Sequence, residues 1–271
     1  MQLPVPTWFV GCGNMGQAMV EGWRSAGVDL SSAVAIRPSG TPVQGLRTVS
    51  SLKEAGSAPR MVVLGFKPQK LDEVVPTLNP WLTSKTIVVS LLAGVEAESL
   101  KRRFPKAIIV RAIPNLPVSV RRGVVALHSD DAGDDVRKQV GDAFAALGMA
   151  MWAESEKALS AIGAVAGAGP AYVARFIAAM ADAATDQGLP DGLARTIALE
   201  TVLGTAWMAA STRETMEEIA RRVASPRGTT EAGLGILDRN NALKELVRTT
   251  IDAARRRGAE LAAEARGEQV A

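Results

Sequence analysis

The chain has 271 residues, enough for one large domain or two modest ones, and its 47% hydrophobic and 22% charged residues are typical of a globular protein. The 31 basic residues exceed the 28 acidic ones by three, too few to indicate a nucleic-acid partner or a membrane surface. The single cysteine and the single histidine, Cys12 and His128, exclude a disulfide and argue against a zinc site or a serine–histidine triad, so no metal is expected.

The sequence carries no evident targeting signal. Its amino-terminal stretch lacks the basic segment and apolar run of a secretion signal. The most apolar stretch, residues 161–174, is shorter than the roughly 18 to 20 residues that span a bilayer. We therefore expect a cytoplasmic protein with no membrane span.

Short apolar runs alternate with amphipathic stretches up to about residue 155. Such runs suit strands that are covered on both faces, which predicts the α/β class and a doubly wound, Rossmann-type domain over residues 1–155. We expect His128 to be a surface histidine of an edge strand rather than a catalytic acid. The predicted strands are residues 7–10, 33–36, 61–66, 87–91 and 107–110, with residues 124–127 and 149–152 as further edge strands that could be antiparallel.

Helical periodicity replaces the strand signals over residues 156–271. The main predicted helices are residues 170–187, 191–210 and 241–265. The first is apolar around almost its whole circumference, which a small domain can hardly bury, and the last keeps close to a 3.5-residue apolar repeat suited to a partner helix. We therefore predict an all-α dimerisation domain and a homodimer with interleaved C-terminal helices.

A Gly-x-Gly-x-x-Gly loop follows the first predicted strand and opens an amphipathic stretch. In this position the glycines allow a tight turn, close approach of a pyrophosphate and close helix packing, while the helix amino terminus favours negative charge. The loop therefore predicts dinucleotide binding by Gly11, Gly13, Asn14, Met15 and Gly16.

The second predicted strand runs into Arg37-Pro38-Ser39. NAD-binding domains usually have an Asp or Glu here, which accepts hydrogen bonds from the adenosine ribose. A guanidinium with a nearby hydroxyl suits a ribose 2′-phosphate instead. Arg37 and Ser39 therefore predict NADP(H) as the cofactor, with NADH as the weaker alternative and an ordinary exposed arginine as the simpler reading.

Three more loops follow the carboxyl ends of predicted strands, where ligands of open α/β sheets gather. Lys67 and Pro68 follow the third strand, Ala93 follows the fourth, and Asn115 follows the fifth. We expect these loops to line one cleft, although each residue alone could be an ordinary solvated or turn residue.

A small polar loop ending in Gly228, Thr229 and Thr230 precedes a helical stretch. If the threonines occupy its opening turn, the unpaired amides there would favour a substrate carboxylate. Plain capping of the helix by a hydroxyl explains the same residues without any ligand. The residues alone leave both readings open.

In this order and spacing, these segments resemble the pyrroline-5-carboxylate reductase family, over nearly the whole chain. The most specific part lies between Gly163 and Leu237, where GAGPAYV, DQGLP, ETVLGTA and VASPRGTTEAGL are similar to motifs of the family's helical domain. VLGFKPQ and RAIPNLP support it earlier in the chain.

The resemblance implies that NADPH transfers a hydride to the C5 imine carbon of Δ1-pyrroline-5-carboxylate and yields L-proline. It also implies a dimer with interleaved C-terminal helices that sometimes assembles into larger rings. By position, the implied substrate-binding residues are Gly228, Thr229 and Thr230, the catalytic residues are Thr230 and Lys67, and the cofactor-lining residues are Lys67, Pro68, Ala93 and Asn115.

The chain departs from the family pattern at three positions. Ala166 and Ala168 stand where serines are common, and Arg227 stands where a glycine is usual, so substrate preference stays open. One alternative is a related NADPH-dependent imine reductase or a β-hydroxyacid dehydrogenase, although the latter would need a helical-domain lysine that residues 163–237 lack. Another is a non-catalytic NADPH-sensing module.

Overall fold

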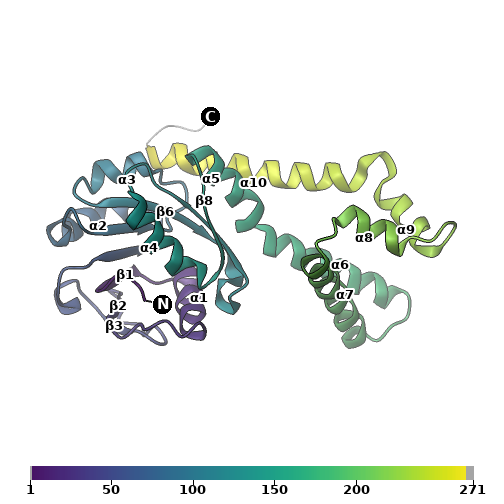
Figure 1. Ribbon diagram of the computed structural model, residues 1–271, viewed down its shortest axis with the longest axis horizontal. Coiled ribbons are helices and arrows are strands. Elements are labelled where there is room, and N and C mark those ends of the chain that lie inside the picture. The colour runs from purple at the N-terminus through teal and green to yellow at the C-terminus, as the bar shows by residue number, and fades with distance from the viewer. Residues whose placement is uncertain (1, 267–271) are drawn as a thin grey trace. The chain divides into compact units, whose positions relative to one another are not determined.

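A computed structural model describes residues 2–266 (Figure 1). The chain divides into two compact units. The first runs to Ala168 and includes the stretch from Ala254 onwards, and the second is Gly169–Ala253. The change in sequence pattern predicts a domain boundary after residue 155, and this boundary stays a prediction.

The first unit is built on an eight-stranded sheet of order β3-β2-β1-β4-β5-β6-β7-β8. Every neighbouring pair is parallel except β6 and β7, which are antiparallel. The fold class expected from the sequence is therefore confirmed for this unit. The strands are β1 (Thr7–Gly11), β2 (Ala33–Ile36), β3 (Arg47–Val49), β4 (Met61–Gly65), β5 (Ile87–Ser90), β6 (Ile108–Pro114), β7 (Gly123–His128) and β8 (Gly148–Trp152).

Helices cover both faces of this sheet (Figure 1). Successive side chains of a strand point to opposite faces, so each central strand contributes to two apolar cores. In β1, Phe9 packs in the core that includes α1 and α4, whereas Trp8 and Val10 pack in the core that includes α2 and α3. These helices are α1 (Asn14–Ser25), α2 (Leu71–Leu78), α3 (Ala97–Arg103) and α4 (Asp134–Ala145).

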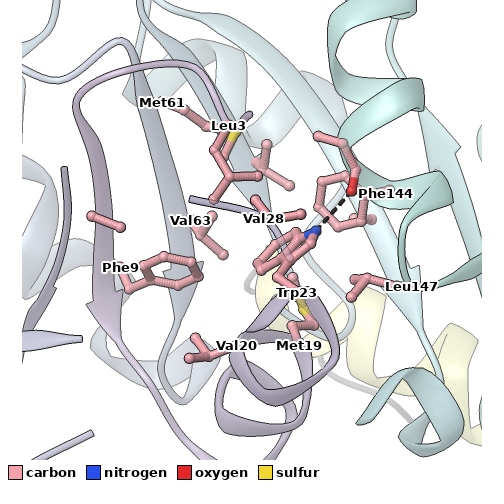
Figure 2. Close-up of a cluster of buried hydrophobic side chains, with 14 of the residues drawn as sticks. Leu3, Phe9, Met19, Val20, Trp23, Val28, Met61, Val63, Phe144 and Leu147 are labelled. Atoms are coloured by element: carbon pink, nitrogen blue, oxygen red, sulfur yellow. Dashed lines mark hydrogen bonds between the residues drawn. The ribbon is translucent and has the colours of Figure 1, made fainter. Parts of the chain in front are cut away.

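Helix α1 is held against the sheet by its apolar face. Figure 2 shows Trp23 between the rings of Phe9 and Phe144, with edge-on centroid distances of 6.0 and 5.4 Å. The indole Nε1–H of Trp23 donates to the Ala143 carbonyl at 2.7 Å, so the buried ring leaves no polar atom unpaired. This packing fixes the direction of α1, whose amino terminus begins three residues after β1.

The structure corrects three details expected from the sequence. Strand β3 was not predicted, and β6 continues to Pro114 rather than ending at residue 110. Strand β7 is not an edge strand, because β8 pairs with it in parallel on its outer side. His128 is consequently buried, and its Nδ1 lies 3.1 Å from the Ala153 carbonyl oxygen.

Helix α5 (Glu156–Ile162) and a π-helical turn (Gly163–Gly167) close the first unit. Leu159 is buried against Ala126 of β7. The Glu156 carboxylate forms an ion pair with the buried Arg111 of β6, and its other oxygen accepts the Ala97 amide of α3 at 2.7 Å. One carboxylate therefore ties α5 to both the sheet and a helix.

The C-terminal end of α10 (Ala242–Arg266) returns to this first unit. It approaches the loop after β5 so closely that a Cβ on Gly94 would lie 2.7 Å from the Leu261 carbonyl. Gly94 also has a φ of 74°, in the left-handed region that favours glycine. Arg266 pairs with Glu96 at 3.0 Å. The loop that carries Ala93 is therefore packed against the last turns of the chain.

The second unit is entirely helical: α6 (Gly169–Asp186), α7 (Asp191–Thr212), α8 (Met216–Val223), α9 (Thr229–Leu237) and the first half of α10. Helices α6 and α7 pack on each other through small residues such as Ala181, Ala194 and Ala198. Most large apolar side chains of this unit remain exposed. Among them are Val173, Phe176, Leu193, Ile197, Leu199, Leu203, Ile236, Leu246 and Val247.

Residues Glu156–Asp186 form one 31-residue helical run with a mean hydropathy of 1.3 over its most apolar window. By length and composition the run could cross a membrane, whereas the sequence suggested an apolar stretch of only residues 161–174. A helix that packs against a second protein chain has the same apolar character. The run also contains Arg175 and Asp182.

Candidate active site

The carboxyl ends of five strands meet at one edge of the sheet. In the parallel registers Val10 pairs with Ile36, Gly11 with Gly65, and Leu64 with Ser90, and β6 continues alongside β5. The strand order reverses at β1, with β2 on one side and β4 on the other. Dinucleotides bind at such a switch point in doubly wound sheets. The structure therefore brings the predicted cofactor residues to one edge.

The glycine loop has the shape that a pyrophosphate site requires. Gly11 has a φ of 75°, and a Cβ there would lie 2.7 Å from the Gly65 carbonyl oxygen. At Gly16 a Cβ would lie 2.8 Å from the Cys12 sulfur. Gly13 is exposed, and its nearest neighbour to a Cβ is 4.0 Å away. The outer glycines thus serve packing, and the middle one leaves the backbone open to a ligand.

The amino terminus of α1 offers free amide groups at this loop. Gly13 is the N-cap residue, and no side chain in the described part of the molecule caps the helix. The first turn, which includes Asn14 and Met15, carries no acidic residue. Unpaired amides and the positive end of the helix dipole both favour an anion.

Arg37 directly follows β2, beside the glycine loop. Its Nη1 atom is buried and has no hydrogen-bond partner among residues 2–266. Burial raises the pKa of the Cys12 thiol to about 11, and the positive charge of Arg37 opposes that shift, which places the guanidinium within electrostatic reach of the loop. A buried cationic donor without a partner is costly unless a ligand completes its hydrogen bonds.

Ser39 lies two residues beyond Arg37 in an exposed turn. Its hydroxyl is 3.0 Å from that of Thr41 and accepts the Thr41 amide at 3.3 Å. Thr41, whose hydroxyl pairs with that of Ser39 in this turn, was not among the residues that the sequence singled out. The repeated hydroxyl at i and i+2 in a glycine-containing turn is the signal that could have indicated it.

The loops after β4 and β5 reach the same edge. Lys67 is exposed, and no partner of its ammonium group is found between residues 2 and 266. Pro68 opens a short 3-10 turn after it, and Ala93 is exposed beside Gly94. These residues therefore line the sheet edge as the spacing indicates, and their roles toward a cofactor stay predictions.

Asn115 is different, because it is 6% exposed and already well bonded. Its Oδ1 accepts the Val124 amide at 2.8 Å, and its Nδ2 donates to the Ala166 carbonyl at 3.0 Å. One N–H and one oxygen lone pair of the amide are left for a ligand. The residue lies at the predicted edge but is part of the protein's own framework.

The threonine loop belongs to the second unit. Gly228 is the N-cap of α9, and Thr229 and Thr230 are its first two residues. Neither hydroxyl caps the helix, and no side chain in the described residues does so. Glu231, in the same turn, instead accepts the Arg227 amide at 2.5 Å. The capping explanation therefore does not match the observed helix start, whose amides are free for an anion.

No group of three or more His, Cys, Asp or Glu side chains that could hold a metal is found within residues 2–266. The titrating groups near the sheet edge are few. The polar groups that the described residues place at this edge are backbone amides, hydroxyls and the side chains of Arg37 and Lys67.

Two family models match the chain. One, described as pyrroline-5-carboxylate reductase dimerisation, matches residues 156–261. The other, described as NADP oxidoreductase coenzyme F420-dependent, matches residues 8–94. The first covers the helical run and the threonine loop, and the second covers the glycine loop and Arg37.

A curated pyrroline-5-carboxylate reductase from Pseudomonas aeruginosa is 35% identical over 263 residues, which cover 94% of this chain and 96% of the relative. The solved pyrroline carboxylate reductase of Plasmodium falciparum with NADP bound superposes with a TM-score of 0.87 at 26% identity, over 97% of this chain and 100% of that one. The pyrroline-5-carboxylate reductase of Coxiella burnetii also gives 0.87, at 31% identity over 95% and 98%.

Proposed function

This chain belongs to the pyrroline-5-carboxylate reductase family, and from that premise we propose that it reduces Δ1-pyrroline-5-carboxylate to L-proline with NADPH. The observation that carries the cofactor assignment is the buried, unpartnered Nη1 of Arg37 beside an uncapped, glycine-lined helix start. The substrate assignment rests on the family. The reaction completes the biosynthesis of proline, and we place it in the cytoplasm.

The residues of the first unit fit a reduced dinucleotide. The free amides at Asn14, Met15 and Gly16 would bind the pyrophosphate, and the open face of Gly13 would let it approach. Arg37 and the Ser39 hydroxyl would bind the ribose 2′-phosphate, which NADH lacks.

The later strand ends would hold the other half of the cofactor. Lys67, Pro68 and Ala93 lie after β4 and β5, on the side of the switch point that binds the second mononucleotide. Asn115 lies after β6 on the same side. Lys67 adds a positive charge near the reacting end.

The start of α9 suits a small carboxylic acid. The amides that follow Gly228 are uncapped, and a carboxylate would accept hydrogen bonds from them. Thr229 and Thr230 add hydroxyls that are not used as caps. The proposal places the substrate carboxylate at Gly228 and Thr229, and the ring nitrogen near the Thr230 hydroxyl.

When bound, NADPH supplies the hydride that adds to C5 of the protonated imine, which leaves NADP⁺ and proline. The protonated imine is already electrophilic, so the main task of the protein is orientation. A threonine hydroxyl is a poor acid near neutral pH. Thr230 therefore binds the ring nitrogen and orders water there rather than donating its own proton.

The direct test uses the purified full chain with racemic Δ1-pyrroline-5-carboxylate and NADPH. We expect loss of NADPH absorbance with formation of L-proline, and deuterium from labelled NADPH at C5 of the product. Binding of NADPH without turnover would instead support a sensing module. Turnover of cyclic imines without a carboxylate, or of β-hydroxyacids, in preference to this substrate would support one of the other reductases.

We further propose that the chain is a homodimer formed through its helical unit, with interleaved C-terminal helices. Large apolar side chains on α6 and α7, such as Val173, Phe176 and Leu203, are exposed in the single chain. Several large apolar side chains left exposed on neighbouring helices usually mark an interface. The match to a dimerisation family over residues 156–261 supports the same reading.

Light scattering after size-exclusion chromatography tests the assembly. We expect a mass of two chains or an even multiple, the latter for a ring of dimers. Phe176→Glu should shift the mass toward a monomer, whereas Lys138→Glu, at an exposed position of α4, should not. A wild-type monomer at micromolar concentration would contradict the proposal.

A further inference from the structure

The π-helical turn at Gly163–Gly167 lies against the carboxyl end of β6. Turns of this type are rare, and they are frequent at functional sites. The sequence of the turn, Gly-Ala-Val-Ala-Gly, contains no polar side chain. Its position therefore depends on backbone contacts and on whatever neighbouring side chains bind its carbonyl groups.

Two residues near the end of β6 determine that position. Ile113 fills the space beside the glycines, and a Cβ on Gly163 would lie 3.0 Å from its Cδ1. Asn115 donates through Nδ2 to the Ala166 carbonyl at 3.0 Å. This is the one side-chain hydrogen bond to the turn in the part of the chain that the structure describes.

Asn115 is itself held rigidly. Its Oδ1 accepts a hydrogen bond from the Val124 backbone N–H at 2.8 Å, and its backbone N–H donates to the Val124 carbonyl at 3.2 Å. The first bond fixes which side-chain atom faces β7, so Nδ2 has to face Ala166. Asn115 thus bridges two strands and the π turn.

The location of this bridge gives it a functional meaning. Strand β6 lies on the β4 side of the switch point, the half of the sheet whose carboxyl edge would bind the nicotinamide mononucleotide in the proposed complex. We propose that Asn115 is a positioning residue for hydride transfer, which acts through the Ala166 carbonyl to hold the π turn as a wall of the nicotinamide site. The inference rests on the proposed function and deepens it.

Asn115→Asp isolates the bond to Ala166. The substitution keeps an acceptor for the Val124 amide but puts a carboxylate oxygen against the Ala166 carbonyl oxygen. The turn should shift, and small misplacements at a reaction centre cost up to about a hundredfold in rate. We expect kcat, measured at saturating NADPH, to fall at least about tenfold.

Asn79→Asp is the matched control. The Nδ2 of Asn79 donates to the Arg103 carbonyl at 2.8 Å, in the same chemical arrangement but after α2. Both variants should lose a similar amount of thermal stability. Only Asn115→Asp should change kcat per folded molecule.

The pH profile gives a signature that a merely structural role would not. When the introduced carboxyl is protonated, its O–H can again donate to the Ala166 carbonyl. The ratio of variant to wild-type kcat should therefore rise as the pH is lowered. The wild-type profile, measured in parallel, removes the effects of substrate and cofactor.

A second perturbation tests the turn from its other side, in case the first variant does not fold. Gly163→Ala would press on Ile113 and should lower kcat in the same way, and Ile113→Val in the same chain should restore it by removing Cδ1. The inference would be overturned if Asn115→Asp kept the wild-type kcat, or if Asn79→Asp lost as much kcat as Asn115→Asp. It would also be overturned if Asn115→Asp changed only the affinity for NADPH. If the Asn115→Asp variant does not fold, the inference would be overturned by a Gly163→Ala variant with unchanged kcat. Absence of wild-type turnover would instead defeat the proposed function.

Discussion

Replacing Arg37 by methionine should weaken the preference for NADPH over NADH and should stabilise the cofactor-free protein. The Nη1 of Arg37 is buried without a partner among residues 2–266, and the guanidinium acts electrostatically on the glycine loop. In the proposed complex the 2′-phosphate of NADPH completes its hydrogen bonds. Without the cofactor, the same donor is an unsatisfied group that destabilises the fold.

The structure sets the size of both effects. A hydrogen bond between charged groups is worth about 1.5 to 3 kcal/mol, so its loss should lower kcat/KM for NADPH roughly 10- to 150-fold. NADH lacks the phosphate, and its kcat/KM should change less than about threefold. Removal of a buried unpaired donor should raise the unfolding free energy of the cofactor-free protein by about 1 kcal/mol, or the Tm by about 2 to 4 °C.

The assay combines initial rates with both cofactors and thermal unfolding with and without NADPH. Arg37→Met should melt above the wild type without cofactor, and below it at the same high NADPH concentration, because the stabilisation by a ligand rises with the logarithm of its concentration divided by its Kd. Arg47→Met is the control. Arg47 is already bonded to the Glu54 carbonyl at 2.7 Å, so its loss should lower stability and leave cofactor preference unchanged.

Two results would refute this reasoning. An unchanged preference for NADPH over NADH in Arg37→Met would show that Arg37 does not bind the 2′-phosphate. A lower Tm without cofactor would mean that the guanidinium stabilises the fold by contacts of its own.

Two other groups give predictions at the level of stability. Burial raises the pKa of the Cys12 thiol from 9.0 to about 11, so the unfolded chain ionises first, and the stability from this group is complete below pH 9 and lost as the pH rises toward 11. Urea unfolding should show the wild type losing about 2 kcal/mol more than Cys12→Ala over that window, and parallel curves would contradict the assignment. Glu156→Gln should lower the unfolding free energy by about 2 kcal/mol, because it leaves Arg111 buried without its counter-ion. Adding Arg111→Met should cost less than the sum of the single changes, and strict additivity in chemical denaturation would argue against the coupling.

The strands were predictable where a continuous apolar run marks burial on both faces, as in β1, β2 and β4. Strand β3 was not, because Arg47-Thr48-Val49 is short and half polar. The prediction that His128 lies at the surface was wrong for a similar reason. An apolar run shows that a strand is buried but does not say which strand pairs with it, and β8 covers the outer side of β7.

The candidate site divides in the same way. The positions of the glycine loop, Arg37 and the start of α9 at strand or helix ends could be predicted, because each is a local pattern that follows a strand or opens a helix, and their roles stay predictions. The bonds of Asn115 were not, because its partners Val124 and Ala166 are remote in sequence. The π turn was missed because Gly163–Gly167 has the composition of an ordinary flexible or helical segment.

The return of α10 to the first unit makes the second unit an insertion rather than an appendage. Gly94 packs against Leu261, so cutting the chain after Ala168 would remove a piece of the domain that it leaves behind. An isolated nucleotide-binding fragment should therefore keep the stretch from Ala254 onwards, joined to Ala168 by a flexible linker.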